Sequence, residues 1–415
     1  MTSPRDVSPT GTNSPLNFAP VDGASSRPRR RILVILGTRP EAVKLCPLIG
    51  ELRRVATRIG VEPVICVTGQ HREMLDQVLE AFEIRPDYDL GIMQPGQTLA
   101  SLTARLMAAL EGVIAEVRPA LAIVQGDTTT TLCGALAAFY AGIPVAHVEA
   151  GLRTHDPQAP FPEEMNRVLA SRLSSLHFAA TPWAAANLTA EGIPLSRITV
   201  TGNTGIDALL YVRDALQSGR LAARPMALPP GKKTIVVTAH RRESFGVGFE
   251  QICEAIARLA QRPDVHVVWP VHLNPEVRRV VFGRLSHCPH IEFLDPLPYV
   301  SFVDVMRRAY LLITDSGGVQ EEAPSLGKPI LVLRDKTERP EAVAAGTAKL
   351  AGTATETIVR EASRLLDDSV EYRRMSRLDN PYGDGRASAR IVHRIEKFLE
   401  TRFSFPAVPA AVAGG

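Results

Sequence analysis

A repeated unit constrains the fold of this sequence. Each unit begins with a short uninterrupted apolar run, which ends at a polar or glycine-containing turn, and the residues after the turn have apolar positions at helical spacing. The first unit runs through residues 32–36 into Gly37-Thr38-Arg39-Pro40. Apolar runs that do not alternate with polar residues indicate strands covered on both faces, as in parallel sheets between layers of helices. The sequence therefore predicts an α/β protein with doubly wound parallel sheets.

The unit recurs in two series, separated by Gly202-Asn203-Thr204-Gly205. The first series predicts a helix over residues 102–115 and strands over residues 32–36, 64–67, 121–124, 144–148 and 177–180. The second predicts a helix over residues 249–259 and strands over residues 234–238, 265–270, 291–294, 311–314 and 329–333. Since 415 residues exceed one ordinary core, we expect two Rossmann-like domains, residues 31–203 and 204–385, that face a cleft. A final helix over residues 386–403 either caps the second domain or crosses back to the first.

The two ends of the chain and its overall composition indicate a soluble cytoplasmic protein. Residues 1–30 and 404–415 are rich in small residues and proline and are expected to be disordered tails. The net charge of +3 gives no basis for a nucleic-acid or membrane partner, and no apolar stretch reaches the roughly 20 residues of a membrane span. The five cysteines form no Cys-x-x-Cys pair, which is typical of buried thiols in a reducing compartment.

A small-residue turn stands where a nucleotide-binding motif would be expected. Neither series carries GxGxxG or GxxxxGK[ST], so the sequence shows no nicotinamide or NTP site. Instead Ser316-Gly317-Gly318 joins a predicted strand to a predicted helix, where backbone N–H groups can bind phosphate; a plain helix cap is the alternative. Glu321 and Glu322 favour phosphate binding, because a carboxylate one turn further on can accept the hydroxyls of a ribose.

Several cations also lie at the predicted carboxyl ends of strands. Each of Arg39, Lys44, His240 and Arg339, taken alone, is more often a surface charge. Together they indicate an anion site, because they share a location at strand ends and a diphosphate requires two or more charge-assisted donors. The sequence predicts a cationic cleft that binds a diphosphate.

Three carboxylates are candidates for proton transfer: Asp127, Glu149 and Glu163. Asp127 could equally be a helix cap. Glu149 ends an apolar strand, so it is expected either to pair with Arg153 or Arg167 or to be functional. Carboxylates facing a cationic cleft suggest proton transfer on a neutral part of a phosphorylated substrate.

Other polar patterns carry less weight. Asp87-Tyr88-Asp89 has the form of a metal-binding Asp-x-Asp motif, but it lacks further ligands and is interpreted as a solvated turn. His272 and His290 are expected to be ordinary histidines beside strands. We expect no metal and no nicotinamide cofactor.

Residues 31–400 closely resemble the non-hydrolysing UDP-N-acetylglucosamine 2-epimerases of bacteria, whose two Rossmann-like domains form the GT-B arrangement. The resemblance rests on motifs that occur in the same order: Gly37-Thr38-Arg39-Pro40-Glu41-Ala42, Gln70-His71-Arg72-Glu73-Met74-Leu75, Gly126-Asp127-Thr128-Thr129-Thr130, His147-Val148-Glu149-Ala150-Gly151-Leu152-Arg153, His240-Arg241-Arg242-Glu243-Ser244-Phe245 and Asp315-Ser316-Gly317-Gly318.

The resemblance implies roles for individual residues. Asp127, Glu149 and Glu163 would surround the sugar and move protons, with His240 beside the departing diphosphate. UDP and the substrate would be held by Arg39, Lys44, Arg167, His240, Phe302, Ser316, Gly317, Gly318, Glu322 and Arg339. Leu297 stands where relatives carry Gln against the uracil. Gln70 and His71 would belong to a second, regulatory UDP-sugar site, although Glu73 replaces the Gln associated with strong activation.

The implied reaction needs no cofactor: UDP leaves, a 2-acetamidoglucal forms, and UDP returns to give UDP-N-acetylmannosamine. A homodimer, hinge closure of the two domains and a role in surface polysaccharide synthesis are further expectations from the family. The alternatives are an enzyme that hydrolyses the intermediate, a glycosyltransferase, and a nucleotide-sugar-binding regulator without turnover.

Overall fold

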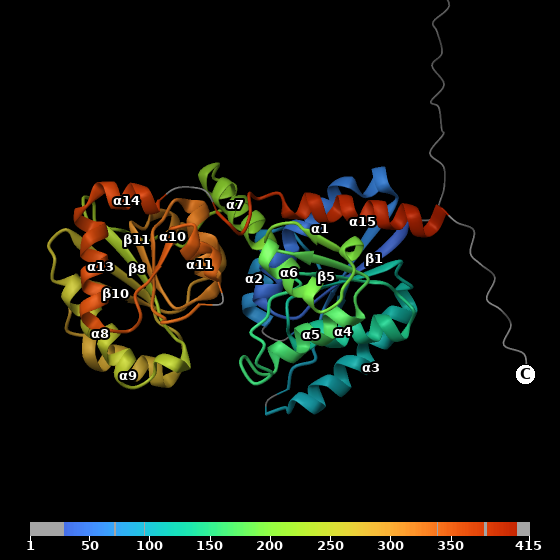
Figure 1. Cartoon of the computed structure of the whole chain (residues 1–415), viewed down its shortest axis with the longest axis horizontal. Helices are drawn as coiled ribbons and strands as arrows, with labels where there is room; N and C mark the ends of the chain where they lie inside the picture. Colours follow the sequence, from blue (N-terminus) through green and yellow to red (C-terminus); the bar gives the residue numbers. More distant parts are fainter. Residues whose placement is uncertain (1–28, 70–71, 95, 338, 377–379, 405–415) are drawn as a thin grey trace, which may run out of the picture.

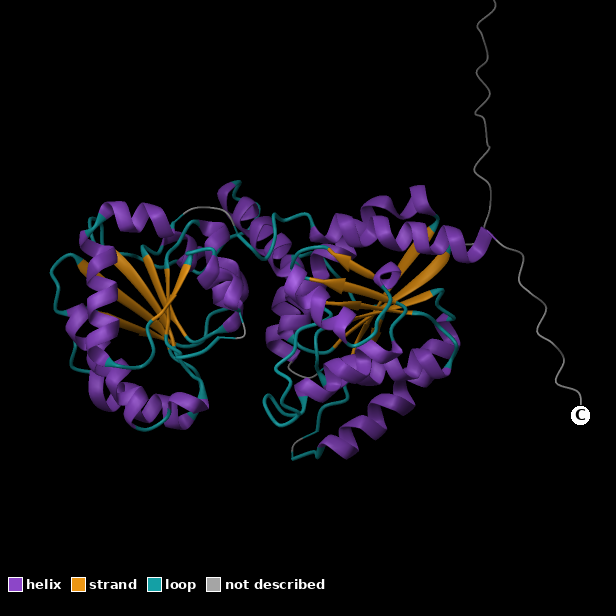
Figure 2. Cartoon of the chain, viewed as in Figure 1, coloured by secondary structure: helices purple, strands orange, loops and turns teal. Residues whose placement is uncertain are grey.

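The computed structural model describes residues 29–69, 72–94, 96–337, 339–376 and 380–404. These residues form two α/β halves that lie side by side, each with a parallel sheet between layers of helices (Figures 1 and 2). The predicted fold class, two doubly wound parallel-sheet domains, is confirmed.

The sheet of the N-terminal half has seven parallel strands in the order β3-β2-β1-β4-β5-β6-β7. In chain order the strands are β1 (Arg30–Leu36), β2 (Val61–Val67), β3 (Tyr88–Asp89), β4 (Leu121–Gln125), β5 (Val145–Val148), β6 (Leu176–Ala179) and β7 (Ile198–Val200). The helices are α1 (Arg39–Ile59), α2 (Arg72–Ala81), α3 (Leu99–Val117), α4 (Thr129–Tyr140), α5 (Glu163–Leu173) and α6 (Pro182–Ala190), with a 3₁₀ turn over Leu195–Arg197.

The sheet of the C-terminal half has six parallel strands in the order β10-β9-β8-β11-β12-β13. They are β8 (Lys233–Thr238), β9 (Val265–Pro270), β10 (Ile291–Leu294), β11 (Leu311–Thr314), β12 (Ile330–Val332) and β13 (Ala348–Leu350). The helices are α8 (Val247–Ala260), α9 (Pro275–Leu285), α10 (Tyr299–Arg308), α11 (Gly317–Glu322), α12 (Pro340–Ala344), α13 (Thr355–Asp367) and α14 (Ser369–Met375), and 3₁₀ turns cover Arg242–Ser244 and Ala323–Leu326.

Two helices complete the structure. Helix α7 (Thr204–Gln217) follows β7 and packs against α1, α10 and α11, so it contacts both halves. Helix α15 (Ala387–Ser404) lies against α1 and α7 of the N-terminal half (Figure 1). Its buried stripe comprises Ile391, Val392, Ile395 and Leu399. No helix among the described residues has the length and apolar character required to cross a membrane.

The order of strands reverses at one place in each sheet, between β1 and β4 and between β8 and β11. In a doubly wound sheet, the chain leaves the carboxyl ends of these two strands toward opposite faces and opens a crevice where ligands bind. The turns that begin at Gly37, Gly126, Ala239 and Asp315 lie at these four strand ends.

Candidate functional site

The two turns at the crevice of the N-terminal half are joined by one buried carboxylate, Glu41. Thr38 caps α1 and forms a capping box with Glu41, whose Oε2 accepts hydrogen bonds from the N–H groups of Gly37 (3.0 Å) and Thr38 (2.7 Å). Its other oxygen, Oε1, accepts a hydrogen bond from the hydroxyl of Thr128 at 2.8 Å, in the turn after β4. Glu41 therefore fixes the turn that carries Arg39 relative to the turn that carries Asp127.

A cavity of about 270 Å³ brings the three predicted carboxylates together, and we call it the carboxylate cavity. Asp127 enters it from the turn after β4, Glu149 from the residue after β5, and Glu163 from the first residue of α5. Its lining comprises Lys44, Asp127, Glu149, Leu152, Arg153, Pro160, Glu163, Arg167, Trp183, Arg241 and Arg339.

Glu149 is held by partners that the sequence analysis did not identify. Its carboxylate forms an ion pair with Lys44 of α1 at 2.5 Å and accepts a hydrogen bond from the side-chain amide of Gln125. Burial raises the pKa of Glu149, and the ammonium of Lys44 opposes this rise. The residue has a φ of 63°, a left-handed conformation that is uncommon outside glycine and that concentrates at functional sites.

The expectation that Glu149 pairs with Arg153 or Arg167 is wrong. Arg153 is buried and forms an ion pair with Glu191 at 2.5 Å. Arg167 pairs with Asp127 at 2.6 Å. Both arginines are nearer to Glu149 in sequence than Lys44 is, but each forms its ion pair with another carboxylate.

Asp127 is not a helix cap, so this alternative is excluded. The N-cap of α4 is Thr128, whose hydroxyl accepts a hydrogen bond from the N–H of Thr131 at 3.1 Å. The carboxylate of Asp127 is left to pair with Arg167. Among the described residues the carboxylate of Glu163, which also lines the cavity, has neither an ion pair nor a hydrogen bond.

A second cavity, of about 360 Å³, lies between the two halves and adjoins the first, since Lys44 and Arg339 line both. We call it the nucleotide cavity. Its lining includes apolar side chains, among them Pro296, Leu297 and Phe302, as well as cationic ones. The predicted binding residues that line it are Arg39, Lys44, His240, Phe302, Ser316, Gly318, Glu322 and Arg339.

His240 is positioned by Asp315, which is fully buried. The Oδ2 atom of Asp315 accepts hydrogen bonds from the N–H groups of His240 (2.6 Å) and Arg241 (2.7 Å), and its Oδ1 lies 3.3 Å from the imidazole Nδ1 of His240. The ring of His272 stacks on that of His240 with 5.1 Å between centroids, and burial lowers the pKa of His272. The sequence analysis treated His272 as an ordinary histidine; no local motif marks it, because its place depends on the pairing of β8 with β9.

The Ser316-Gly317-Gly318 turn begins α11, which has only six residues. A helix this short has a weak dipole, so cationic side chains must supply most of the attraction for an anion. The N–H of Ser316 already donates to the hydroxyl of Thr314 at 2.9 Å. Gly317 is needed for close packing, because a Cβ there would lie 2.6 Å from the guanidinium carbon of Arg339.

Glu321 and Glu322 have different surroundings, although both line the nucleotide cavity. Both carboxylate oxygens of Glu321 are engaged, one by Arg339 at 2.8 Å and the other by the amide of Asn203 at 2.8 Å. Glu322 has the hydroxyl of Tyr299 at 3.4 Å, and burial, with the nearby charge of Glu321, raises its pKa to about 8. Of the two, Glu322 is the carboxylate with acceptor capacity left for a ligand.

Other candidate sites have structural explanations or fall outside the described residues. Asp87 accepts a hydrogen bond from the N–H of Ile65 at 2.8 Å, which joins the start of β3 to β2, and the described part of the chain holds no cluster of His, Cys, Asp and Glu suited to a metal ion. The predicted regulatory residues Gln70 and His71 lie outside the described residues.

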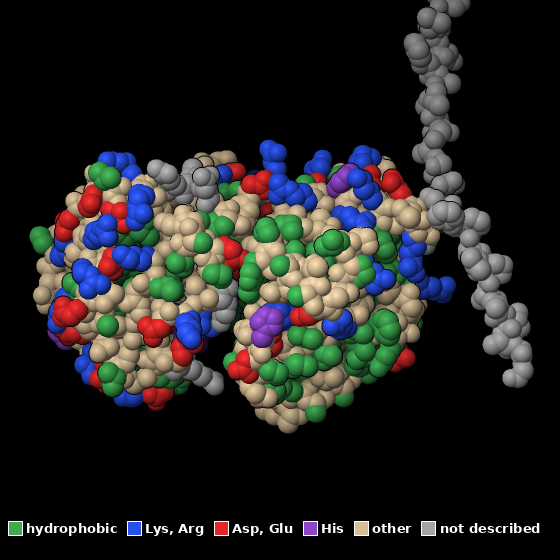
Figure 3. Space-filling view, in the orientation of Figure 1, with side chains coloured by type: hydrophobic (Ala, Val, Ile, Leu, Met, Phe, Trp, Pro, Cys, Tyr) green, Lys and Arg blue, Asp and Glu red, His purple; other side chains and the backbone are tan. Residues whose placement is uncertain are grey.

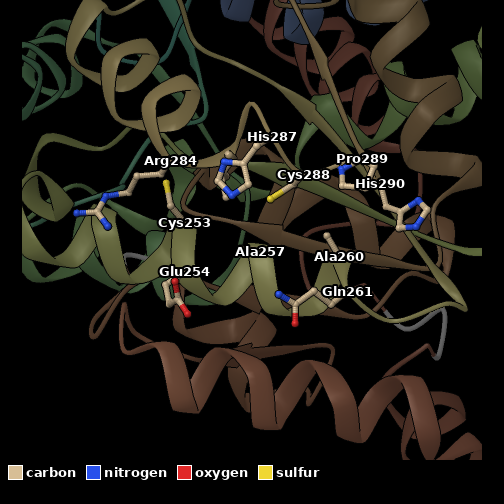
Figure 4. Close-up of a pocket in the computed structure, with 11 residues that line it drawn as sticks. Cys253, Glu254, Ala257, Ala260, Gln261, Arg284, His287, Cys288, Pro289 and His290 are labelled. Carbon is tan, nitrogen blue, oxygen red and sulfur yellow. The ribbon is translucent and has the colours of Figure 1, made fainter.

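A separate cavity of about 400 Å³ lies on the C-terminal half, against α8 and the turn between α9 and β10 (Figure 4). Two thiols, Cys253 and Cys288, line it together with His287 and His290. All five cysteines of the chain are free, and burial raises the pKa of Cys253 to about 12, which leaves it a thiol at neutral pH.

Comparison with known proteins places the chain among nucleotide-sugar epimerases. The family model described as UDP-N-acetylglucosamine 2-epimerase matches residues 53–396. The UDP-N-acetylglucosamine 2-epimerase of Escherichia coli K12 is 54% identical over 372 residues, which cover 88% of this chain and 98% of that protein.

Solved structures agree with the sequence matches. The crystal structure of UDP-GlcNAc 2-epimerase from Neisseria meningitidis bound to UDP-GlcNAc is similar with a TM-score of 0.82 and 46% identity, covering 88% of this chain and 100% of that one. The enzyme of Methanocaldococcus jannaschii in complex with UDP-GlcNAc and UDP gives a TM-score of 0.72 and 33% identity, over 88% of this chain and 99% of that one. With its fold, its ordered motifs and these matches, the chain belongs to the UDP-N-acetylglucosamine 2-epimerase family.

Proposed function

We propose that this protein interconverts UDP-N-acetylglucosamine and UDP-N-acetylmannosamine without hydrolysis, by elimination of UDP and its re-addition. The observation that carries the proposal is the junction of the two cavities: the carboxylate cavity opens beside the nucleotide cavity, and Lys44 and Arg339 line both. This arrangement suits a substrate with a neutral sugar at one end and a nucleoside diphosphate at the other. The names of the similar proteins support the same substrate.

In this proposal the nucleotide cavity holds UDP. Arg39, Arg339 and His240 would face the diphosphate, since charged donors in a partly buried site bind phosphate oxygens strongly. Glu322 would accept hydrogen bonds from the ribose hydroxyls, and the uracil would lie beside the apolar side chain of Phe302. Gly317 lets Arg339 lie across the start of α11, and Leu297 gives the uracil an apolar neighbour in place of the amide that relatives have.

The chemistry of the sugar explains why UDP must leave. The proton on carbon 2 is not acidic, because no carbonyl group is adjacent to it. When the bond between carbon 1 and the β-phosphate oxygen breaks, its electron pair departs with UDP, and loss of the carbon 2 proton forms the carbon 1–carbon 2 double bond of 2-acetamidoglucal. Return of UDP to carbon 1 and of a proton to the opposite face of carbon 2 completes the inversion. Arg39, Arg339 and His240 would stabilise the charge on departing UDP.

The three carboxylates of the carboxylate cavity would move the protons. Glu149 has a raised pKa, which makes it a stronger base than an ordinary carboxylate, and Gln125 and Lys44 hold it in place. Glu163 lies in the same cavity and forms no ion pair with any residue that the structure describes. Asp127, Glu149 and Glu163 enter from three different elements, which suits proton access to two faces of one carbon.

The test of this function separates retention of UDP from its release. Purified protein is incubated with UDP-N-acetylglucosamine alone, and the products are resolved by anion-exchange chromatography. We expect UDP-N-acetylmannosamine with no net loss of UDP-sugar. Free UDP rising in step with free N-acetylmannosamine would assign the protein to the hydrolysing alternative, a requirement for an acceptor sugar would indicate a glycosyltransferase, and binding without any product would indicate a regulator.

The proposed product is an activated sugar donor, whose charged nucleotide prevents it from crossing a membrane unaided. We therefore propose a cytoplasmic location and a place before a glycosyl transfer that consumes N-acetylmannosamine units, as in polysaccharide synthesis. The free thiols agree with a reducing compartment.

We also propose a homodimer, formed through the face made by α3, α4 and α5. Four apolar side chains are exposed near the end of α4 and on α5: Phe139 (55%), Tyr140 (72%), Met165 (39%) and Leu169 (42%). Figure 3 shows hydrophobic side chains gathered on the surface over this part of the N-terminal half. A groove of about 720 Å³ beside Tyr140 is lined by Met107, Ile114 and both an acidic and a basic residue, Glu111 and Arg118.

A second copy of the chain suits this face. Around a two-fold axis the same patch meets itself, so Tyr140 of one copy can enter the groove of the other and Glu111 can face Arg118. Sedimentation of the wild type should give twice the monomer mass, and Tyr140→Asp should give a monomer that retains its circular dichroism. A wild-type monomer at micromolar concentration would overturn the homodimer.

A further inference from the structure

We infer that Trp183 determines specificity for the sugar, by placing its indole against the acetamido group of an N-acetylhexosamine. This inference rests on the proposed function and goes beyond it, because it assigns sugar recognition to a residue outside the motifs of the sequence analysis. Trp183 lies in α6 and lines the carboxylate cavity together with Asp127, Glu149 and Glu163.

The composition of the cavity shows why an apolar wall matters. Most of its lining is charged, and its apolar side chains are Leu152, Pro160 and Trp183. An acetamido group combines a methyl group with a polar amide. Charged walls can bind the amide and the hydroxyl groups, but the methyl group needs apolar contact to be taken from water favourably. Trp183 is the largest apolar surface in the cavity, and its indole N–H can also serve as a donor.

The start of α6, which carries Trp183, packs on the loop that carries Glu149. Gly151, two residues after Glu149, has a φ of 92°, and a Cβ there would lie 2.1 Å from the carbonyl oxygen of Ala184. The amide of Asn187 donates a hydrogen bond to the carbonyl oxygen of Gly151 at 2.9 Å. The start of α6 therefore packs directly on this loop, so contacts with Gly151 fix the backbone that carries Trp183 relative to the loop that carries Glu149.

The exposure of Trp183 is consistent with a surface that a ligand covers. Its side chain is 36% exposed, whereas the other tryptophan of the chain, Trp269, is completely buried in the core of the C-terminal half. A partly exposed tryptophan in the wall of a polar cavity offers apolar area at little cost in conformational entropy. Because Trp183 lines the cavity, a sugar bound there would cover part of its surface.

Two measurements test the inference. First, binding of UDP, UDP-glucose and UDP-N-acetylglucosamine is measured by calorimetry; UDP-glucose has a hydroxyl in place of the acetamido group. We expect the wild type to bind UDP-N-acetylglucosamine more tightly than UDP-glucose. In Trp183→Ala the ratio of these two affinities should fall about tenfold, while the affinity for UDP is unchanged. Trp183→Phe should retain most of the preference. Leu195→Ala, which removes an apolar side chain that is 73% exposed and lines neither cavity, is the control.

Second, tryptophan fluorescence reports contact directly, because the chain has two tryptophans and Trp183→Phe leaves only Trp269. We expect UDP-N-acetylglucosamine to change the emission of the wild type more than UDP does, and this difference to vanish in Trp183→Phe. If Trp183→Ala binds UDP and keeps the full preference for the acetamido sugar, the inference is wrong while the proposed function stands. If the wild type binds no UDP, both fail.

Discussion

At the scale of single residues, Glu149 and its ion pair with Lys44 are central to the proposed reaction. A carboxylate with positive φ, buried beside a lysine and a glutamine amide, is held in one orientation at some cost in backbone energy, about 1–3 kcal/mol. Such a strained backbone conformation persists only where several surrounding contacts hold the residue in it. Here β5, α1 and Gln125 each contribute a constraint.

Glu149→Gln should lower turnover by about 100-fold or more while the affinity for UDP changes little. The amide keeps the shape of the side chain but cannot accept the carbon 2 proton. Turnover is measured with UDP-N-acetylglucosamine, and UDP affinity by calorimetry.

The matched control is Glu361→Gln. Glu361 also forms an ion pair with a lysine, Lys349, and its side chain is 11% exposed against 9% for Glu149, but it lies in α13 and lines neither the carboxylate nor the nucleotide cavity. Equal losses of turnover in the two variants, or an equal loss of UDP binding and turnover in Glu149→Gln, would contradict a catalytic role for Glu149.

Glu322 should make the stability of the ligand-free protein depend on pH. Its pKa rises from 4.5 to about 8 in the folded state, so the folded protein binds a proton that the unfolded chain releases between these values. This stabilising contribution is complete below pH 4.5 and is lost as pH rises through about 8. A glutamine at this position does not titrate, so the free energy of unfolding of Glu322→Gln should increase relative to that of the wild type as pH rises from 5 to 9. The full pKa shift of Glu322 corresponds to about 5 kcal/mol, which is the upper limit of this increase.

Melting temperatures of the two proteins across this pH range, without nucleotide, check the prediction. A constant difference between Glu322→Gln and the wild type from pH 5 to pH 9 would show that Glu322 is ionised throughout.

The sequence predicted which residues would meet but not how they would pair. The positions of Asp127 and Glu149 at strand ends sufficed to bring them near one another, because neighbouring parallel strands end at the same edge of a sheet. The partner of Glu149 could not be predicted, since Lys44 is 105 residues away and reaches it only through the packing of α1 on the sheet. The stacking of His272 on His240 depends in the same way on tertiary structure.

At the scale of elements, the interior strands were predictable, whereas of the four edge strands only β10 was predicted. Strands β1, β4 and β11 are buried almost throughout, so their apolar runs are continuous. Strands β3, β7 and β13 were missed; they have two or three residues each and are largely exposed or half-buried. An edge strand with one neighbour needs no continuous apolar run, and three residues carry no recognisable period.

Substitution of Gly317 tests whether the start of α11 positions Arg339 for the nucleotide. Gly317→Ala should weaken UDP binding by about tenfold or more, because the new Cβ would lie 2.6 Å from the guanidinium carbon of Arg339 and would push it from its place between Glu321 and the nucleotide cavity. Calorimetry with UDP measures the effect.

Gly283→Ala, in the last turn of α9, is the control for this change. A Cβ at Gly283 meets no atom within 4 Å, so this substitution should leave UDP binding unchanged and should stabilise the helix by up to about 1 kcal/mol. Unchanged UDP affinity in Gly317→Ala would contradict the expectation that the new Cβ displaces Arg339 from the nucleotide.

At the scale of the whole molecule, the two halves are connected on one side of the nucleotide cavity. Asn203, at the start of α7, donates a hydrogen bond to Glu321 of the other half at 2.8 Å. Helix α15 leaves the C-terminal half and lies on the N-terminal half, where Glu396 pairs with Arg58 of α1 at 2.6 Å. These connections are compatible with a hinge, so we propose that closure of the halves around the substrate shields the glucal intermediate from water.

Helix α15 should stabilise the N-terminal half through its buried stripe. Ile395 is completely buried against that half, so Ile395→Ala should cost about 2–5 kcal/mol and lower the melting temperature by several degrees. His393→Ala, two residues earlier on the exposed side of the same helix, should have little effect. Equal melting temperatures for the two variants would show that α15 adds no stability to the half on which it lies.

Proton NMR of the purified protein with UDP-N-acetylglucosamine in deuterated water, with no cofactor added, tests the proposed epimerisation at carbon 2. The account predicts UDP-N-acetylmannosamine carrying deuterium at carbon 2, because the carbon 2 proton leaves during elimination and a solvent-derived one returns on the opposite face. It also predicts that Glu149→Gln slows this exchange together with epimerisation. UDP-N-acetylmannosamine that retains the original proton at carbon 2, or its replacement by free UDP and N-acetylmannosamine, would contradict it.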